Sequence, residues 1–143
     1  MANGGENLKL IEDGQVKVIL YNGAVIKTEC SWAKSEFDEY QDFCKGTAKY
    51  PNVGNNLTYP VLGLCGESGE VAEKVKKLFR DSGGVLTPEV RKAILKEIGD
   101  VAWYVAMVAH EIGYNMSDVI TENKDKLTSR KERNVISGSG DER

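Results

Sequence analysis

Apolar residues recur every three or four positions in four stretches of the chain, which is the spacing of a buried helix face. Start and stop signals bound these stretches, such as Thr87-Pro88 before the third and Gly113 after it. The pattern predicts four helices, at about residues 35–48, 59–80, 88–112 and 117–131. The longest apolar run, Val101 to Ala109, is too short to span a bilayer. We therefore expect an all-α domain without a membrane-spanning segment.

The first 34 residues follow a different pattern. Residues 1–14 are rich in Gly and Asn and predict a loop, whereas two β-branched runs, 15–20 and 24–28, flank Tyr21-Asn22-Gly23. An Asn-Gly turn between such runs predicts a short β-hairpin. We expect three parts: an N-terminal extension with this hairpin (1–34), a helical domain (35–131) and a polar tail (132–143).

The composition is that of an ordinary globular protein. With 143 residues, 41% of them hydrophobic and 29% charged, the chain can bury one substantial core. A net charge of −3 provides no basic footprint for binding nucleic acid, and the N-terminus lacks the basic and apolar segments of a signal peptide. The three widely spaced cysteines fit neither a disulfide framework nor a zinc site. These features predict a cytoplasmic protein with no membrane or nucleic-acid partner.

Two pairs of acids interrupt the apolar helical sequence: Glu67 with Glu70, and Glu97 with Asp100. Acids three residues apart lie on one helical face, and a short turn allows the second and third helices to pack antiparallel. Packing these faces together would gather four carboxylates, which repel one another unless a cation binds. Oxygen ligands without His or Cys favour Mg²⁺ or Mn²⁺, and magnesium commonly completes its shell with phosphate oxygens. A nucleotide or pyrophosphate compound is the expected ligand.

Other interpretations of these acids remain open. The chain has 22 acids, so pairs at this spacing arise by chance, and the four could be solvated or paired with Lys74 and Lys96. A di-iron carboxylate bundle would require Glu-x-x-His pairs, but the only histidine, His110, has Met107 three positions earlier. We interpret His110 as a partly buried residue outside the site.

The fourth predicted helix offers candidate phosphate ligands. Asn123, Lys126 and Arg130 share one face, and they present one amide and two cations. The same face could instead be simply solvated. Elsewhere, four aromatic residues are most simply core, although one could stack on a base near the metal: Phe37, Tyr40, Trp103 and Tyr104. Glycines at 63, 66 and 69 indicate close approach of another backbone or a ligand.

The residues around the two acidic pairs form an extended motif, GLCGESGEVAEK at 63–74 and EIGDVAWY at 97–104. This motif resembles that of the MazG-type all-α nucleoside triphosphate pyrophosphohydrolases, whose pattern is Glu-x-x-Glu, a variable spacer and Glu-x-x-Asp. The spacer here has 26 residues. Residues 39–41 and 123–130 are similar to the family's first and fourth helices, so the resemblance covers about residues 35–143.

The resemblance implies a four-helix MazG-like bundle that forms a homodimer or homotetramer, with helices from two subunits around each site. It implies metal-dependent hydrolysis of a (d)NTP to (d)NMP and pyrophosphate, with Mg²⁺ required and Mn²⁺ able to replace it. Four acids would hold the metal and carry out catalysis: Glu67, Glu70, Glu97 and Asp100. Lys126 and Arg130, assisted by Asn123, would bind the phosphates.

The length is similar to that of stand-alone bacterial and bacteriophage members, for which purine deoxynucleotides such as dGTP or dATP are reasonable substrates. The N-terminal extension matches nothing in the family. The alternative from another functional class is a non-catalytic helical module for nucleotide sensing or oligomerisation.

Overall fold

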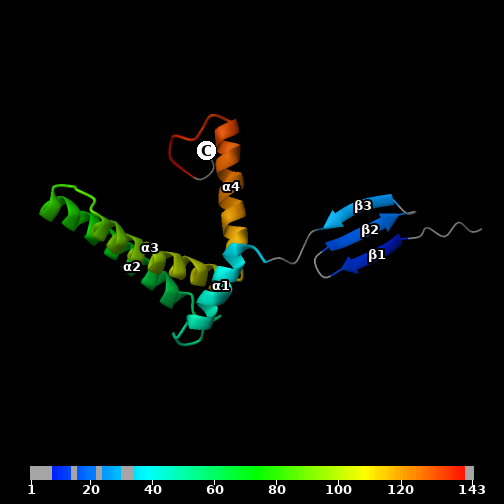
Figure 1. Ribbon diagram of the computed structural model, residues 1–143, viewed down its shortest axis with the longest axis horizontal. Helices are drawn as coiled ribbons and strands as arrows, with labels where there is room; N and C mark the ends of the chain where they lie inside the picture. The colour runs from blue at the N-terminus through cyan, green and yellow to red at the C-terminus, as the bar shows by residue number, and fades with distance from the viewer. Residues whose placement is uncertain (1–7, 14–15, 22–23, 30–33, 141–143) are drawn as a thin grey trace, which may run out of the picture. The chain divides into compact units, whose positions relative to one another are not determined.

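The computed structural model describes residues 8–13, 16–21, 24–29 and 34–140 (Figure 1). The chain divides into two units, residues 1–36 and residues 37–143. The first unit contains strands and the second contains helices.

The N-terminal unit contains a three-stranded antiparallel sheet in the order β1 (Leu8–Asp13), β2 (Val16–Tyr21) and β3 (Ala24–Glu29). The prediction of a loop through residue 14 was wrong for β1. Its sequence, LKLIED, is half apolar, and its backbone pairs with β2 along the whole strand. β2 and β3 occupy the two runs predicted to form a hairpin, with a register shift between Ile19 and Leu20. Their connection, residues 22–23, lies outside the described residues, so the hairpin stays a prediction.

The described residues from 34 to 140 contain four helices, and each boundary lies within about two residues of its prediction. They are α1 (Glu36–Thr47), α2 (Thr58–Ser82), α3 (Pro88–Glu111) and α4 (Met116–Glu132). α2 ends because Gly83 adopts a left-handed conformation, with φ of 56°. α3 begins where the hydroxyl of Thr87 accepts a hydrogen bond from the backbone N–H of Val90.

α2 and α3 form a long antiparallel pair, whereas α4 leads away from that pair after the turn that follows α3 (Figure 1). Within the described part of one chain, the four helices therefore do not close into the predicted four-helix bundle. None of the described helices combines the length and the apolar character needed to cross a membrane.

The core lies where α1, the loop that follows it, the second half of α3 and the start of α4 meet. Its buried members are Cys44, Tyr50, Ala106, Met107, Ala109 and Met116. The side chain of Gln41, also buried, donates to the carbonyl oxygens of Ala106 (3.1 Å) and Tyr114 (3.0 Å). These bonds satisfy its amide nitrogen and connect α1 to α3 and to the turn between α3 and α4.

A carboxylate at the end of α3 fixes the loop between α1 and α2. Glu111 accepts hydrogen bonds from the Tyr50 hydroxyl (2.5 Å) and from the backbone N–H groups of Gly54 (2.9 Å) and Asn56 (2.7 Å). Burial alone would raise the pKa of Glu111, but these bonds and the charge of His110 outweigh burial, and the pKa is lowered. The clamp sets where α2 begins relative to α3, and thereby the pairing of the two helices.

Candidate metal centre

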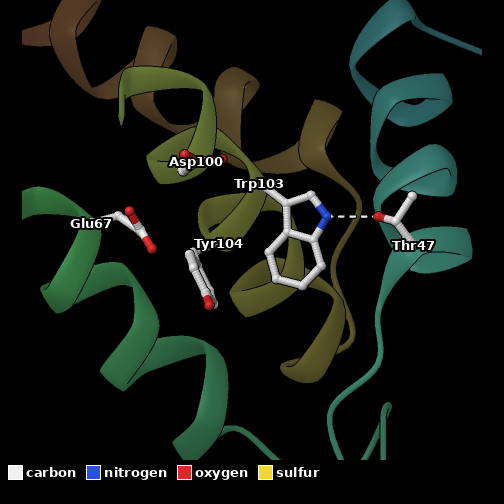
Figure 2. A pocket seen from close by; sticks show the side chains of 5 residues that line it. All are labelled: Thr47, Glu67, Asp100, Trp103 and Tyr104. Atoms are coloured by element: carbon white, nitrogen blue, oxygen red, sulfur yellow. Dashed lines mark hydrogen bonds between the residues drawn. The ribbon is translucent and has the colours of Figure 1, made fainter. Parts of the chain in front are cut away.

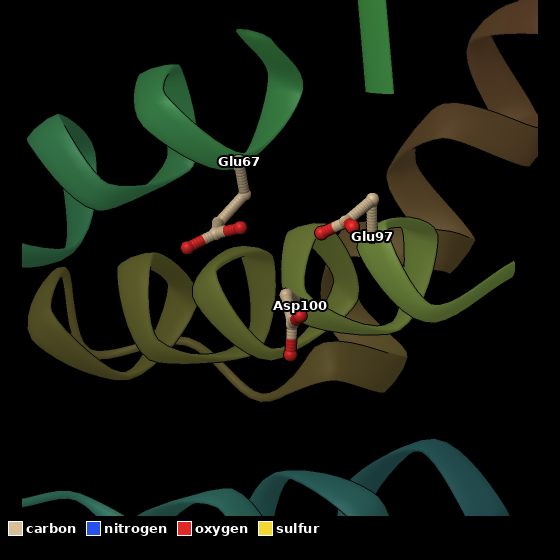
Figure 3. A group of neighbouring side chains, drawn as sticks. All are labelled: Glu67, Glu97 and Asp100. Carbon is tan, nitrogen blue, oxygen red and sulfur yellow. The ribbon is translucent and has the colours of Figure 1, made fainter. Parts of the chain in front are cut away.

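Three of the predicted acids come together between α2 and α3. Glu67 extends from α2, and Glu97 and Asp100 extend from α3 (Figure 3). Each offers one carboxylate oxygen, and these oxygens all lie within 4.8 Å of one another. Glu67 and Glu97 are partly buried and Asp100 is exposed. The spacing of three residues on α3 places both of its acids on the face that meets Glu67.

The fourth predicted acid, Glu70, does not belong to this group. It lies nearly one turn further along α2 and is exposed. Its charge still acts on the cluster: burial raises the pKa of Glu67 above its ordinary value, and the charges of Asp100, Glu97 and Glu70 raise it further. Burial is the largest cause of this shift, and the three neighbouring acids act in the same direction.

A lysine lies beside the cluster. The ammonium nitrogen of Lys74 on α2 is 3.2 Å from a carboxylate oxygen of Glu97 on α3. The spacing of four residues on one helix predicts Lys74 as a local partner of Glu70. The structure instead shows an ion pair between helices, which no local spacing rule could have found.

The donor set fits a hard divalent cation. All three neighbouring groups are carboxylates, and neither His nor Cys takes part. Oxygen donors of this kind suit Mg²⁺ and Mn²⁺, whereas zinc and copper sites draw on imidazole or thiolate. A divalent ion would also offset the repulsion that raises the pKa of Glu67.

A cavity of about 420 Å³ opens next to the acids, lined by Thr47, Glu67, Asp100, Trp103 and Tyr104 (Figure 2). The Trp103 and Tyr104 rings meet edge to face, with centroids 4.9 Å apart and an angle of 84° between planes. The indole N–H of Trp103 donates to the hydroxyl of Thr47 at 2.8 Å. The cavity thus has an acidic end and an aromatic end.

Only part of the cavity lining is predictable from the sequence. Its pattern is compatible with Trp103 and Tyr104 either as core residues or as a surface for stacking a base. Thr47 was missed, because its partner lies 56 positions further along the chain. One weak signal existed: a threonine at the end of a predicted helix is free to use its hydroxyl elsewhere.

Of the three glycines on α2 at 63, 66 and 69, one makes a close contact. A Cβ added at Gly63 would lie 2.1 Å from the Tyr104 ring, whereas one at Gly66 or Gly69 would meet nothing within 4 Å. The predicted close approach therefore exists at Gly63, where the neighbour is a side chain and not a backbone. Burial raises the pKa of Tyr104, and the nearby charges of Glu67 and Asp100 contribute.

The predicted phosphate ligands lie on α4 and do not line the acidic cavity in the described part of this chain. Asn123 and Lys126 are exposed and line a separate hollow that includes Tyr114. Arg130 is buried, with 5% of its surface exposed, and its guanidinium donates to the carbonyl of Gly140 at 3.4 Å. One chain alone does not bring these residues to the acids.

Comparison with known proteins gives two matches. Residues 57–135 match a family described as the MazG nucleotide pyrophosphohydrolase domain. The chain is also 48% identical over 111 residues to the Gene 37 protein of Mycobacterium phage L5, a match that covers 74% of this chain and 97% of that protein. No solved structure matches. The family match spans α2, α3 and α4, and so includes all four acids and all three predicted phosphate ligands.

Proposed function

This chain belongs to the MazG nucleotide pyrophosphohydrolase family, and on that premise we propose that it hydrolyses a (d)NTP to the (d)NMP and pyrophosphate with a divalent metal. The observation that carries the proposal is the convergence of Glu67, Glu97 and Asp100, two of which, Glu67 and Asp100, line one end of a cavity. Purine deoxynucleotides such as dGTP or dATP are the first candidates as substrates.

In this proposal, Glu67, Glu97 and Asp100 hold Mg²⁺ or Mn²⁺, and Glu70 adds negative charge from the next turn of α2. A bound divalent ion supplies neutralisation of phosphate oxygens and a water of lowered pKa. The carboxylates fix where the triphosphate lies, because they face the cavity from both helices. The aromatic end leaves room for the nucleoside.

We also propose that the phosphate ligands on α4 act within a homodimer or homotetramer. Several apolar side chains on α2 and α3 are exposed, including Leu62 (67%), Phe79 (68%) and Leu95 (66%). Burying each such side chain would contribute roughly 1.5–3 kcal/mol. A second copy that covered these faces could complete a four-helix bundle and bring cations to the acids, as bundle sites commonly use facing helices.

The test is pyrophosphate release from the eight common NTPs and dNTPs, with Mg²⁺, with Mn²⁺ and with chelator. We expect turnover of at least one nucleotide, lost on chelation and abolished by Glu97→Gln. Glu89→Gln is the matched control, since Glu89 is an exposed acid at the first turn of the same helix. Undiminished release by the Glu97→Gln variant would remove these acids from the mechanism, and nucleotide binding without any turnover would support the non-catalytic module instead.

A further inference from the structure

We propose that Trp103 is the stacking surface for the base of the bound nucleotide and that Thr47 is the positioning residue that holds its indole ring. The inference deepens the proposed function and rests on it, because it assigns the aromatic end of the same cavity. The acids occupy one end of that cavity, so a nucleotide whose phosphates meet them carries its nucleoside toward the other end. The volume of about 420 Å³ lies in the range of roughly 300–1,000 Å³ that small-molecule sites have.

Trp103 is available for this contact. It is only partly buried, and it packs against the core cluster. Its two ring neighbours, Tyr104 and Tyr50, both lie at 84° to the indole plane. Among the described residues no ring stacks parallel to the indole, whereas Tyr50 and Tyr59 do stack on each other. A planar base could therefore take the parallel position, which typically contributes about 5-fold or more to affinity.

The hydroxyl of Thr47 holds the indole ring of Trp103 and forms two hydrogen bonds. The hydroxyl donates a hydrogen bond to the carbonyl oxygen of Cys44, one turn earlier on α1, at 2.9 Å. Its oxygen accepts a hydrogen bond from the indole N–H at 2.8 Å. Since the hydroxyl proton is used on α1 itself, the oxygen faces Trp103 as an acceptor. This bond fixes the rotation of the ring, so the stacking surface is already oriented before the nucleotide binds.

The chemistry of such a surface defines what it selects. Stacking accepts any base, because every base has a π face. It therefore distinguishes a nucleotide from an inorganic polyphosphate, and it favours the two fused rings of a purine over the smaller ring of a pyrimidine.

The experiment uses the full chain with Trp32→Phe, which leaves Trp103 as the only tryptophan. Fluorescence titrations with Mg²⁺ compare dGMP, dCMP and deoxyribose 5-phosphate. We expect dGMP to quench Trp103 and to bind about 5-fold or more tightly than the base-free sugar phosphate, with dCMP between them. Thr47→Val should cut the affinity for dGMP about 5-fold without changing that for deoxyribose 5-phosphate, and Thr47→Ser, which keeps the acceptor, should restore it.

Loss of affinity for both ligands in Thr47→Val would show a merely structural role and would overturn the inference. Equal binding of dGMP and deoxyribose 5-phosphate by the parent protein would also overturn it. The proposed function is tested separately: turnover of nucleotides, together with equal binding of dGMP and deoxyribose 5-phosphate, supports the hydrolase and rules out the stacking surface. Quenching by dGMP without any turnover of triphosphates retains the stacking surface and removes the hydrolase.

Discussion

Gly63 and Tyr104 fit together so closely that a Cβ on the glycine would lie 2.1 Å from Cε1 of the tyrosine ring. The contact joins α2 to α3 beside the acidic cluster, because Gly63 precedes Glu67 by one turn and Tyr104 follows Asp100 by one turn. The glycine therefore serves close packing, and its absent side chain is the space that the ring occupies.

Gly63→Ala should displace the Tyr104 ring. The overpacking cost of about 1–3 kcal/mol exceeds or cancels the gain of up to about 1 kcal/mol that alanine brings to a helix. A Cβ at Gly66 would meet nothing within 4 Å, so Gly66→Ala should stabilise the folded protein by about 1 kcal/mol. Thermal unfolding of both variants decides the matter. If Gly63→Ala gains as much stability as Gly66→Ala, the ring is not held against the glycine.

The helices and the acids were predictable because their signals are local. Thr87 and Gly113 bound α3 on the chain itself, and the spacing of three between Glu97 and Asp100 places both on one face. The contacts that shape the cavity were not predictable in this way. The bond from Trp103 to Thr47 spans 56 positions, and it depends on how α1 crosses α3. Tertiary packing determines which residues form such pairs, and the periodicity of the sequence does not reveal them.

Strand β1 was missed for the opposite reason. A local signal existed, since Leu8 and Leu10 alternate with Lys9 and Ile11 is β-branched, but the Gly- and Asn-rich residues before them favour a loop.

Glu111→Gln should weaken the clamp on the loop before α2. Hydrogen bonds to a charged acceptor contribute about 1.5–3 kcal/mol, so we expect a loss of roughly 2 kcal/mol at pH 7. The pKa of Glu111 is lowered in the folded protein, so its stabilisation is present above the ordinary carboxyl value of 4.5 and is lost as pH falls through the folded value. Urea unfolding from pH 7 to pH 3 should show the two proteins converging in acid. A difference that stays constant over this range would contradict the role of the charge.

Glu67→Gln should separate metal binding from the stability of the metal-free protein. The pKa of Glu67 is raised by folding, so its contribution lowers the stability of the metal-free protein as pH rises through the folded value. At pH 8 with chelator, the variant should therefore unfold at a higher temperature than the parent protein.

The same variant should lose the response to Mg²⁺. With Mg²⁺ at 100 times its dissociation constant, the parent protein should gain about 2.7 kcal/mol of stability, and the variant should not. Differential scanning fluorimetry measures both, and Glu89→Gln should respond to Mg²⁺ as the parent does. An unchanged Mg²⁺ response in Glu67→Gln would place the metal elsewhere.

Asp38→Ala should loosen the start of α4 and, with it, the proposed phosphate ligands. The Asp38 carboxylate accepts hydrogen bonds from the backbone N–H and the hydroxyl of Ser117, each at 2.9 Å, and so caps α4 from α1. Losing a cap of this kind costs about 1–2 kcal/mol. Asp42→Ala is the matched control, since Asp42 on α1 forms an ion pair with Lys45 near the surface and should cost no more than about 0.5 kcal/mol. Hydrogen exchange of the α4 amides, measured beside urea unfolding, should accelerate in Asp38→Ala alone. Equal exchange in the two variants would show that α4 is held by its apolar contacts and not by this cap.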